Sequence, residues 1–310
     1  RILFTRPCWV IENRHWTTAS SSSSVAFQRN IGVLHPGAMG ATVAQTLMDS
    51  GHQVGWVSAN RSVDTAQRAK GFVSFNSLDE IAAWADAMIS VCPPHGAVEL
   101  AERVHATGFT GLYVDANALA PSTSLKIAEI IGTGAYVDGG IIGPPAINAG
   151  STRMYLSGQH GAGVAHWFSA GALQAIALPF DDGGSQEQQV AASMLKMSYA
   201  AYSKGASALL LSVNALAEAG GVAHALRSEW AISAPDLLKR SEFTAKMTSG
   251  KAWRFQGEML EISETYSNAG LPDDFHAGAA AIYERMSRLK DLPPQELDAV
   301  IAAILAQSRS

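Results

Sequence analysis

A glycine-containing turn near the start of the chain has the residue types that bind phosphate. The stretch Ile31-Gly-Val-Leu-His-Pro-Gly-Ala-Met-Gly40 leads from an expected strand into an expected helix at 41–50. Gly37 would let the backbone approach a pyrophosphate, Gly40 would let the helix pack closely on the strand, and the helix N-terminus attracts anions. We predict a dinucleotide-phosphate site here, with an ordinary tight turn as the alternative, formed by His35, Pro36, Gly37, Ala38, Met39 and Gly40.

A second expected strand, at 53–57, ends in a polar and basic tip, Ser58-Ala-Asn-Arg-Ser62. Proteins that select NAD usually carry an Asp or Glu at this tip, whereas the first carboxylate here is Asp64. The planar guanidinium of Arg61 can pair with a 2′-phosphate, and Asn60 and Ser62 can donate hydrogen bonds to it. The tip therefore predicts that NADP(H) is preferred over NAD(H), and a solvated turn with an incidental arginine is the alternative.

A lysine in an apolar helix is the candidate for proton transfer. Lys196 and Lys204 are the only charged residues between 191 and 216, a stretch rich in Ala, Leu, Met and Ser. A desolvated ammonium loses stability and its pKa falls toward neutral, which suits a general acid or base, whereas a lysine that reaches solvent keeps its charge. Tyr199 lies three residues further on and shares the helix face. We predict Lys196 and Tyr199 as catalytic, with a packing role as the alternative for Tyr199.

These candidates need a scaffold that brings distant segments together. Strands and helices alternate from residue 30 to about 138, and the chain from 189 onward is predicted to be helical. The pattern predicts an α/β fold, with an N-terminal Rossmann-type doubly wound sheet at 30–188 and an all-α C-terminal domain at 189–310 that begins with a long interdomain helix. The carboxyl ends of parallel strands meet at one edge. We therefore expect one crevice to hold the glycine turn together with Arg61, Cys92, Pro93, Pro94, Asn117 and Asp138.

The first 29 residues differ in composition from the rest. They hold four arginines, one acidic residue (Glu12) and the serine run 20–24. This composition is similar to that of an organellar transit peptide, and an upstream extension outside the fold explains it equally well. Cys8 and Cys92 cannot form a disulfide framework, which fits a reducing compartment. We expect a cytoplasmic protein, or a mitochondrial one if 1–29 is a transit peptide.

The composition also excludes several classes of function. The formal net charge is −5 and no long basic run occurs, which argues against nucleic acid as a partner. No apolar stretch reaches the ~20 residues that span a membrane. No His, Cys, Asp and Glu residues have metal-ligand spacing, so we expect no metal site. The partner predicted is a small-molecule substrate, and the 47% of apolar residues suffice for an oligomer interface as well.

Four blocks of sequence between residues 30 and 300 resemble the β-hydroxyacid dehydrogenase and 6-phosphogluconate dehydrogenase superfamily. They are the glycine turn, the Asn60-Arg61-Ser62 tip, the pair Asp138-Gly-Gly-Ile-Ile-Gly-Pro-Pro145 and Gly150-Ser-Thr-Arg-Met-Tyr-Leu-Ser-Gly158, and Lys196 early in a long helix. Trp253-Arg-Phe-Gln-Gly-Glu-Met259 resembles a subgroup with a C-terminal domain of uncertain function. The resemblance implies a homodimer, a catalytic Lys196, and substrate binding by Gly139, Gly140, Ile141 and Lys196.

The function implied is an NADP-dependent oxidoreductase that interconverts a small β-hydroxy acid, or a related secondary alcohol, and its carbonyl by hydride transfer. The alternatives are an imine reductase-like enzyme and a non-catalytic NADP-binding redox sensor. Three differences between this sequence and the family pattern bear on the choice among these functions. His35 replaces the first glycine of the family turn, Tyr199 and Ala200 stand where two asparagines are usual, and the loop 142–145 is stiffer and poorer in hydrogen-bond donors. Glu258 matches a late acidic residue of the superfamily, and we expect it to pair with Arg254 on one helix face.

Overall fold

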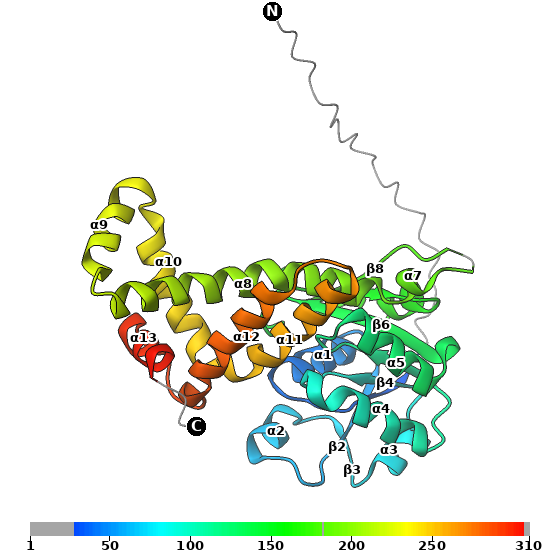
Figure 1. Cartoon of the computed structure of the whole chain (residues 1–310). Helices are drawn as coiled ribbons and strands as arrows, with labels where there is room; N and C mark the ends of the chain where they lie inside the picture. Colours follow the sequence, from blue (N-terminus) through cyan, green and yellow to red (C-terminus); the bar gives the residue numbers. More distant parts are fainter. Residues whose placement is uncertain (1–27, 182, 307–310) are drawn as a thin grey trace, which may run out of the picture.

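The computed structural model describes residues 28–181 and 183–306, so almost all of the predicted N-terminal extension lies outside the described part. An eight-stranded sheet with helices on both faces is followed by a group of helices (Figure 1). The strand order is β3-β2-β1-β4-β5-β6-β7-β8, and every neighbouring pair is parallel except β6 and β7. The strands are β1 Asn30–Val33, β2 Gln53–Val57, β3 Val73–Phe75, β4 Ala87–Ser90, β5 Leu112–Asp115, β6 Tyr136–Ile142, β7 Thr152–Ser157 and β8 Leu173–Ala177.

Both faces of the sheet are buried, as a parallel sheet requires. All four residues of β4 are buried. One apolar cluster joins the sheet to α1 and to the segment around Trp167, and a second joins the other face to α3, α4 and α5. The helices of this part are α1 Ala38–Asp49, α2 Val63–Arg68, α3 Leu78–Trp84, α4 Ala97–Ala106, α5 Pro121–Ile131, α6 Gly161–Ala165 and α7 Gln186–Gln189.

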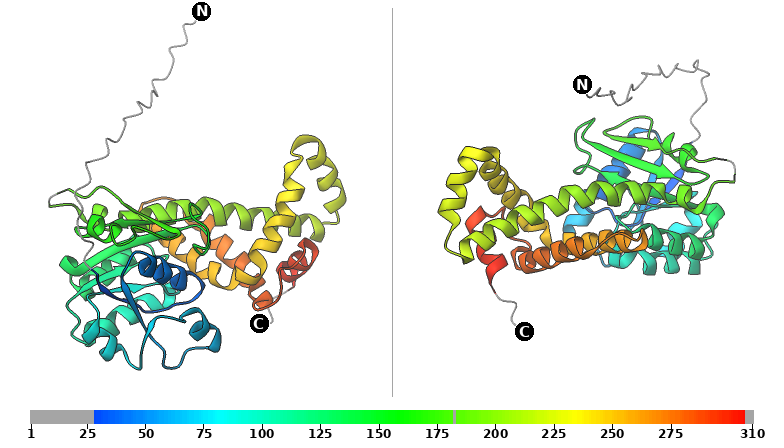
Figure 2. Two further views of the ribbon diagram at one scale, coloured as in Figure 1. Left: turned by 180° about the vertical axis from the view of Figure 1, so that it is seen from behind. Right: turned by 45° about the horizontal axis from the view of Figure 1, so that its top comes forward.

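From residue 191 the described chain is helical and has its own apolar core. The helices are α8 Ala191–Ala219, α9 Ala223–Ser233, α10 Asp236–Thr248, α11 Ala252–Asn268, α12 Asp274–Met286 and α13 Leu297–Leu305. The long α8 runs from the sheet to the α9–α10 pair, which forms the end furthest from the sheet (Figure 2). The predicted α/β class with an all-helical C-terminal part is therefore confirmed. The division at 188/189 stays a prediction.

The chain differs from the sequence-based expectation around the glycines of β6. The family resemblance implies that Gly139 and Gly140 bind substrate, but both lie within β6, which continues to Ile142. A Cβ on Gly140 would lie 2.6 Å from the carbonyl oxygen of Ala192, so the glycine lets α8 lie directly on the strand. Glycine has a low intrinsic strand preference, so the sequence did not predict a strand at these positions. The reason for Gly140 is its contact with α8, which only tertiary packing creates.

A buried carboxylate fastens the start of α8 to the sheet. Asp138 accepts hydrogen bonds from the backbone N–H of Ser193 at 2.7 Å, from the Ser193 hydroxyl at 2.6 Å and from the Ser157 hydroxyl at 3.1 Å. Burial raises the pKa of Asp138 to about 6, and the three hydrogen bonds oppose that rise. The expectation that Asp138 faces the crevice was wrong, because its side chain is buried under α8 and is only 1% exposed.

A second polar contact joins α11 to the start of α5. Ala120 precedes α5, and no side chain of its own segment caps that helix. Glu261 of α11 accepts from the Ala120 backbone N–H at 2.6 Å and from the Thr123 hydroxyl at 3.1 Å. A carboxylate at this position satisfies an N–H group that the helix leaves unpaired and interacts favourably with the helix dipole. The helical part is thus fixed to the N-terminal part at two places, through α8 on β6 and through α11 on α5.

We predict that Asp138→Ala lowers the free energy of unfolding by about 2–4 kcal/mol, because it leaves buried donors without an acceptor. Asp138→Asn keeps one acceptor oxygen and is expected to lose less. Urea denaturation followed by circular dichroism measures both, with the exposed Asp64→Ala as the matched control. A loss no larger than that of the control would show that the carboxylate does not fasten α8.

Candidate active site

A cavity of about 460 Å³ lies between the carboxyl edge of the sheet and the helical part. Ten of the residues predicted from the sequence line it: Gly37, Ala38, Met39, Gly40, Cys92, Pro93, Pro94, Asn117, Ile141 and Lys196. Its opposite wall comes from α8 and from the first turns of α11, and consists of Lys204, Lys251, Trp253, Arg254, Phe255 and Glu258. The cavity therefore brings together segments that are more than 200 residues apart in the sequence.

The glycine turn has the shape that a pyrophosphate needs. Gly37 is the N-cap of α1, and no side chain caps that helix end. A Cβ on Gly37 would meet no atom within 4 Å, so the backbone there faces open space. A Cβ on Gly40 would collide with the carbonyl oxygen of His35, so this glycine serves the packing of the helix on the turn. These observations fit the backbone of a dinucleotide-binding turn.

A second cavity, of about 660 Å³, lies at the tip of β2. Its lining includes His35, Asn60, Arg61 and, from α4, Arg103. Burial, together with the charges of Arg61 and Arg103, lowers the pKa of His35 to about 4, so the imidazole is neutral at physiological pH. Its Nδ1 atom is buried and has no hydrogen-bond partner among the described residues.

Two predicted cofactor residues line neither cavity. Pro36 is buried behind the glycine turn. Ser62 caps α2, because its hydroxyl accepts from the backbone N–H of Thr65 at 3.2 Å.

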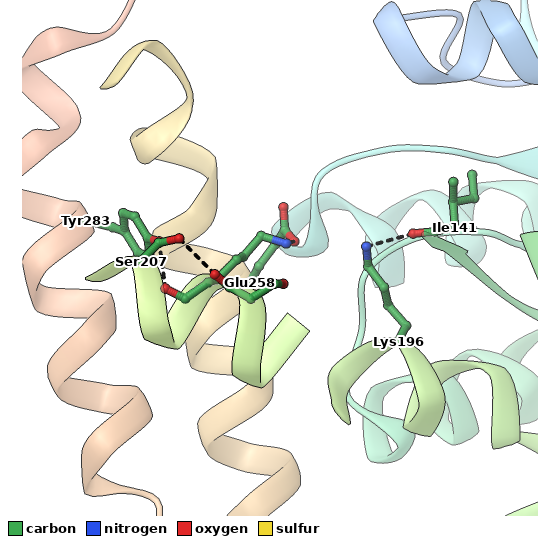
Figure 3. Close-up of polar contacts among 7 residues, drawn as sticks. Ile141, Lys196, Ser207, Glu258 and Tyr283 are labelled. Carbon is green, nitrogen blue, oxygen red and sulfur yellow. Dashed lines mark hydrogen bonds and ion pairs between the residues drawn. The ribbon is translucent and has the colours of Figure 1, made fainter. Parts of the chain in front are cut away.

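Lys196 lies where burial changes its chemistry. Its Nζ donates a hydrogen bond to the carbonyl oxygen of Ile141 at 2.7 Å (Figure 3). Burial and, to a smaller extent, the charge of Lys204 lower the pKa of Lys196 to about 8, and Glu258 opposes the shift. The amine is therefore divided between its neutral and charged forms near pH 8, as a group that both takes and gives protons should be.

Lys204 and Glu258 form an ion pair on the helical side of the cavity. Their charged atoms are 2.6 Å apart, and both side chains are largely buried. Burial alone would raise the pKa of Glu258, but the neighbouring Lys204 and Lys196 hold it below its usual value. The predicted pairing of Glu258 with Arg254 is replaced by this contact with α8.

Asn117 is held by three hydrogen bonds at the end of β5. Its Oδ1 accepts from the Cys92 backbone N–H at 2.5 Å, its Nδ2 donates to the Ser90 hydroxyl at 2.9 Å, and its own N–H donates to Asp115 at 3.0 Å. Burial raises the pKa of the Cys92 thiol to about 11. Cys92 is therefore a thiol and not a nucleophilic thiolate near neutral pH, and both residues shape the wall of the cavity.

Three further predicted residues line neither cavity. Gly139 and Gly140 are buried in β6, packed against Ala116 and α8 respectively, and do not line the cavity. Tyr199 shares α8 with Lys196 but is 54% exposed and lies outside the cavity. Their assigned roles in substrate binding and proton transfer gain no support from these positions.

Sequence analysis did not assign Lys204, Lys251, Trp253, Arg254, Phe255 or Glu258 to the site. One signal was present in Lys204, which follows Lys196 by eight residues in an otherwise uncharged helical stretch. At about 3.6 residues per turn, eight residues bring two side chains close to the same face. For α11 no periodicity indicated which face would meet the sheet.

Comparison with known proteins agrees with this architecture. Residues 217–286 match a domain of unknown function, DUF1932. An uncharacterized 28.5 kDa protein of Methanothermus fervidus is 28% identical over 194 residues, 62% of this chain and 72% of that protein. A conserved protein of unknown function, described as structurally similar to 3-hydroxyacid dehydrogenases, is 22% identical with a TM-score of 0.59 over 84% of this chain and 97% of that one.

A Mycobacterium tuberculosis 3-hydroxyisobutyrate dehydrogenase, described with L-serine, has a TM-score of 0.59 at 17% identity, covering 90% of this chain and all of that one. The chain has the fold of the 3-hydroxyacid dehydrogenases. The resemblance inferred from the sequence is thereby confirmed in its fold and in its C-terminal domain of unknown function.

The described residues offer neither a metal site nor a membrane-spanning helix. Within 28–181 and 183–306, no group of three or more His, Cys, Asp and Glu side chains could hold a metal ion. In the same ranges, none of the helices combines the length and the apolar character needed to cross a membrane.

Proposed function

We propose that the protein is an NADP(H)-dependent oxidoreductase that interconverts a small β-hydroxy acid, or a related secondary alcohol, and its carbonyl compound. The observation that carries this proposal is the partly buried Lys196, with a pKa of about 8, in the same cavity as the glycine turn. The compounds named for the similar M. tuberculosis structure, 3-hydroxyisobutyrate and L-serine, are both β-hydroxy carboxylic acids.

Lys196 serves as the proton-transfer group in this proposal. In oxidation the hydroxyl proton of the substrate passes to the neutral Nζ, the C–H bond breaks with its electron pair leaving as hydride, and the C=O bond forms. The bound nicotinamide supplies the acceptor for that hydride. In reduction, the protonated Nζ returns the proton to the oxygen. The carbonyl of Ile141 orients the amine, and Lys204 disfavours its charged form.

The cavity at the tip of β2 supports the preference for NADP(H). Arg61 and Arg103 line it together, and each lowers the pKa of the nearby His35. Asp79 is the single carboxylate among its described lining residues. Two guanidinium groups against one carboxylate favour an anion such as a 2′-phosphate over the uncharged ribose hydroxyl of NAD.

An exposed apolar face of α8 supports a homodimer. Tyr202, Leu209 and Leu216 recur every seven residues, so they share one helix face, and they are 76%, 50% and 73% exposed. Large apolar side chains on one face are typical of an interface with another chain.

We predict that Lys196→Ala lowers kcat/KM for oxidation by ~10²–10⁴-fold, the usual contribution of a positioned acid–base group. In the wild type, kcat/KM for oxidation should rise with pH and level off above about 8, because only the neutral amine accepts the proton. NADPH absorbance, followed with a panel of β-hydroxy acids, their carbonyl partners and cyclic imines, measures both.

Lys239→Ala, an exposed lysine on α10, is the matched control. NADPH fluorescence establishes that the Lys196 variant still binds the cofactor. Turnover of imines and of no hydroxy acid would contradict the proposed reaction. Binding of NADPH with no turnover of any compound would instead favour the redox sensor.

We predict that Arg61→Ala and Arg103→Ala each weaken NADPH binding by ~10–100-fold, the range for a charged hydrogen bond, with little change for NADH. Titration of protein fluorescence with each nucleotide gives the dissociation constants, and the fragments 2′,5′-ADP and 5′-AMP isolate the contribution of the phosphate. Equal affinity of the wild type for NADPH and NADH would refute the cofactor preference.

We predict that Leu209→Glu shifts the protein from dimer to monomer, because it places a charge on the proposed interface. Sedimentation velocity measures the shift, with Glu218→Gln on the same helix as the control. A wild type that sediments as a monomer at micromolar concentration would exclude the dimer.

A further inference from the structure

The sheet side of the active-site cavity has few groups that can bind a carboxylate. Pro93, Pro94, Pro144 and Pro145 line it, and proline has no backbone N–H to donate. The Asn117 amide is already bonded to Cys92 and Ser90. The glycines of β6, which the family resemblance assigned to the substrate, are buried against α8 and the sheet.

The helical side of the same cavity carries the positive charge. Lys204, Lys251 and Arg254 line it there, together with one carboxylate, Glu258. Glu258 is committed to Lys204 at 2.6 Å. Within the described ranges, Lys251 and Arg254 form no ion pair with any carboxylate. Two cations thus line the cavity without an ion-pair partner of their own, and Arg254 is close enough to Glu258 to help lower the pKa of that carboxyl.

Arg254 is the better placed of the two for recognition. Its guanidinium carbon lies 5.9 Å from the ring centre of Phe255, whose ring also receives the ammonium of Lys204 at 5.1 Å. Contact with an aromatic ring restricts the orientation of a guanidinium. The planar group can then bind both oxygens of a carboxylate at once. Lys251, at the start of α11, adds positive charge at the same end.

We propose that Arg254 binds the carboxylate of the substrate, so that recognition of the acid group comes from the helical part and not from the loop after β6. This inference rests on the proposed function, and it names the recognised substrate class as carboxylic acids as opposed to their neutral esters. The carboxylate lies toward α11, and the carbon that loses hydride lies toward Lys196 and the glycine turn.

The test compares an acid with its uncharged analogue in the intact protein. Kinetics with NADP are measured for a panel of β-hydroxy acids, beginning with 3-hydroxyisobutyrate, and for their methyl esters. Arg254→Gln should raise KM for the acid by ~10–100-fold, the range for a lost charged hydrogen bond, with a much smaller change in kcat. KM for the ester should stay within ~2-fold, because the ester has no charge to lose, and Arg254→Lys should recover part of the affinity for the acid.

Arg240→Gln is the matched control, since Arg240 is exposed on α10 and does not line the cavity. The inference is overturned if Arg254→Gln changes the acid and the ester equally, or changes neither. The proposed function fails separately, if the wild type turns over no acid of the panel.

Binding of the same acids to the NADP-loaded protein by calorimetry then decides the inference alone. Loss of acid binding in Arg254→Gln supports it, whereas unchanged binding, or no binding to the wild type, overturns it.

Discussion

The hydrogen bonds between Asp138 and the start of α8 fix the position of the helical part relative to the sheet. Asp138 accepts from the N–H and the hydroxyl of Ser193, and Gly140 on the same strand leaves room for the helix to lie against it. Lys196 follows Ser193 by three residues, close to one turn of helix, and meets the carbonyl of Ile141 on the same strand. The position of the lysine is therefore set by one strand and by one buried carboxylate, and not by a flexible loop.

Burial at this junction determines the chemistry that the lysine can perform. A fully solvated lysine has a pKa near 10.4 and remains protonated at neutral pH. In this cavity, loss of solvent and the nearby charge of Lys204 bring the pKa to about 8, whereas Glu258 keeps it from falling further. The two members of the ion pair Lys204–Glu258 thus shift the pKa of Lys196 in opposite directions. Lys204 lies on α8 and Glu258 on α11, so the packing of these two helices determines the net shift in the pKa of Lys196.

The sequence was most informative where a local pattern has a local cause. The glycine turn, the basic tip at Arg61 and the apolar helix around Lys196 depend on neighbouring residues, and the structure places each of them at the lining of a cavity. Alternating strands and helices likewise sufficed for the fold class. Each of these features could be predicted because one or two consecutive elements produce it.

The site residues that were misassigned or missed depend on contacts between segments that are distant in the sequence. The family resemblance assigned Gly140 to the substrate, and its contact with Ala192 could not be foreseen because the two residues lie 52 positions apart in the sequence. Tyr199 shares a helix with Lys196, yet the packing of α8 leaves it exposed. Arg254 and Lys251 could not be assigned to the site at all, since only the packing of α11 against the start of α5 and the segment Pro94–Gly96 brings them to the cavity. Such residues are visible once tertiary packing is known.

The most direct test of this account is the titration of Lys196 itself. Lysine side chains labelled with 13C and followed by NMR report the pKa of each amine, and Lys196→Arg identifies the resonance. Lys196 is expected to titrate at about 8, well below the ordinary lysine value of ~10.4. A titration of Lys196 above pH ~10, at the ordinary lysine value, would contradict its role as the proton-transfer amine.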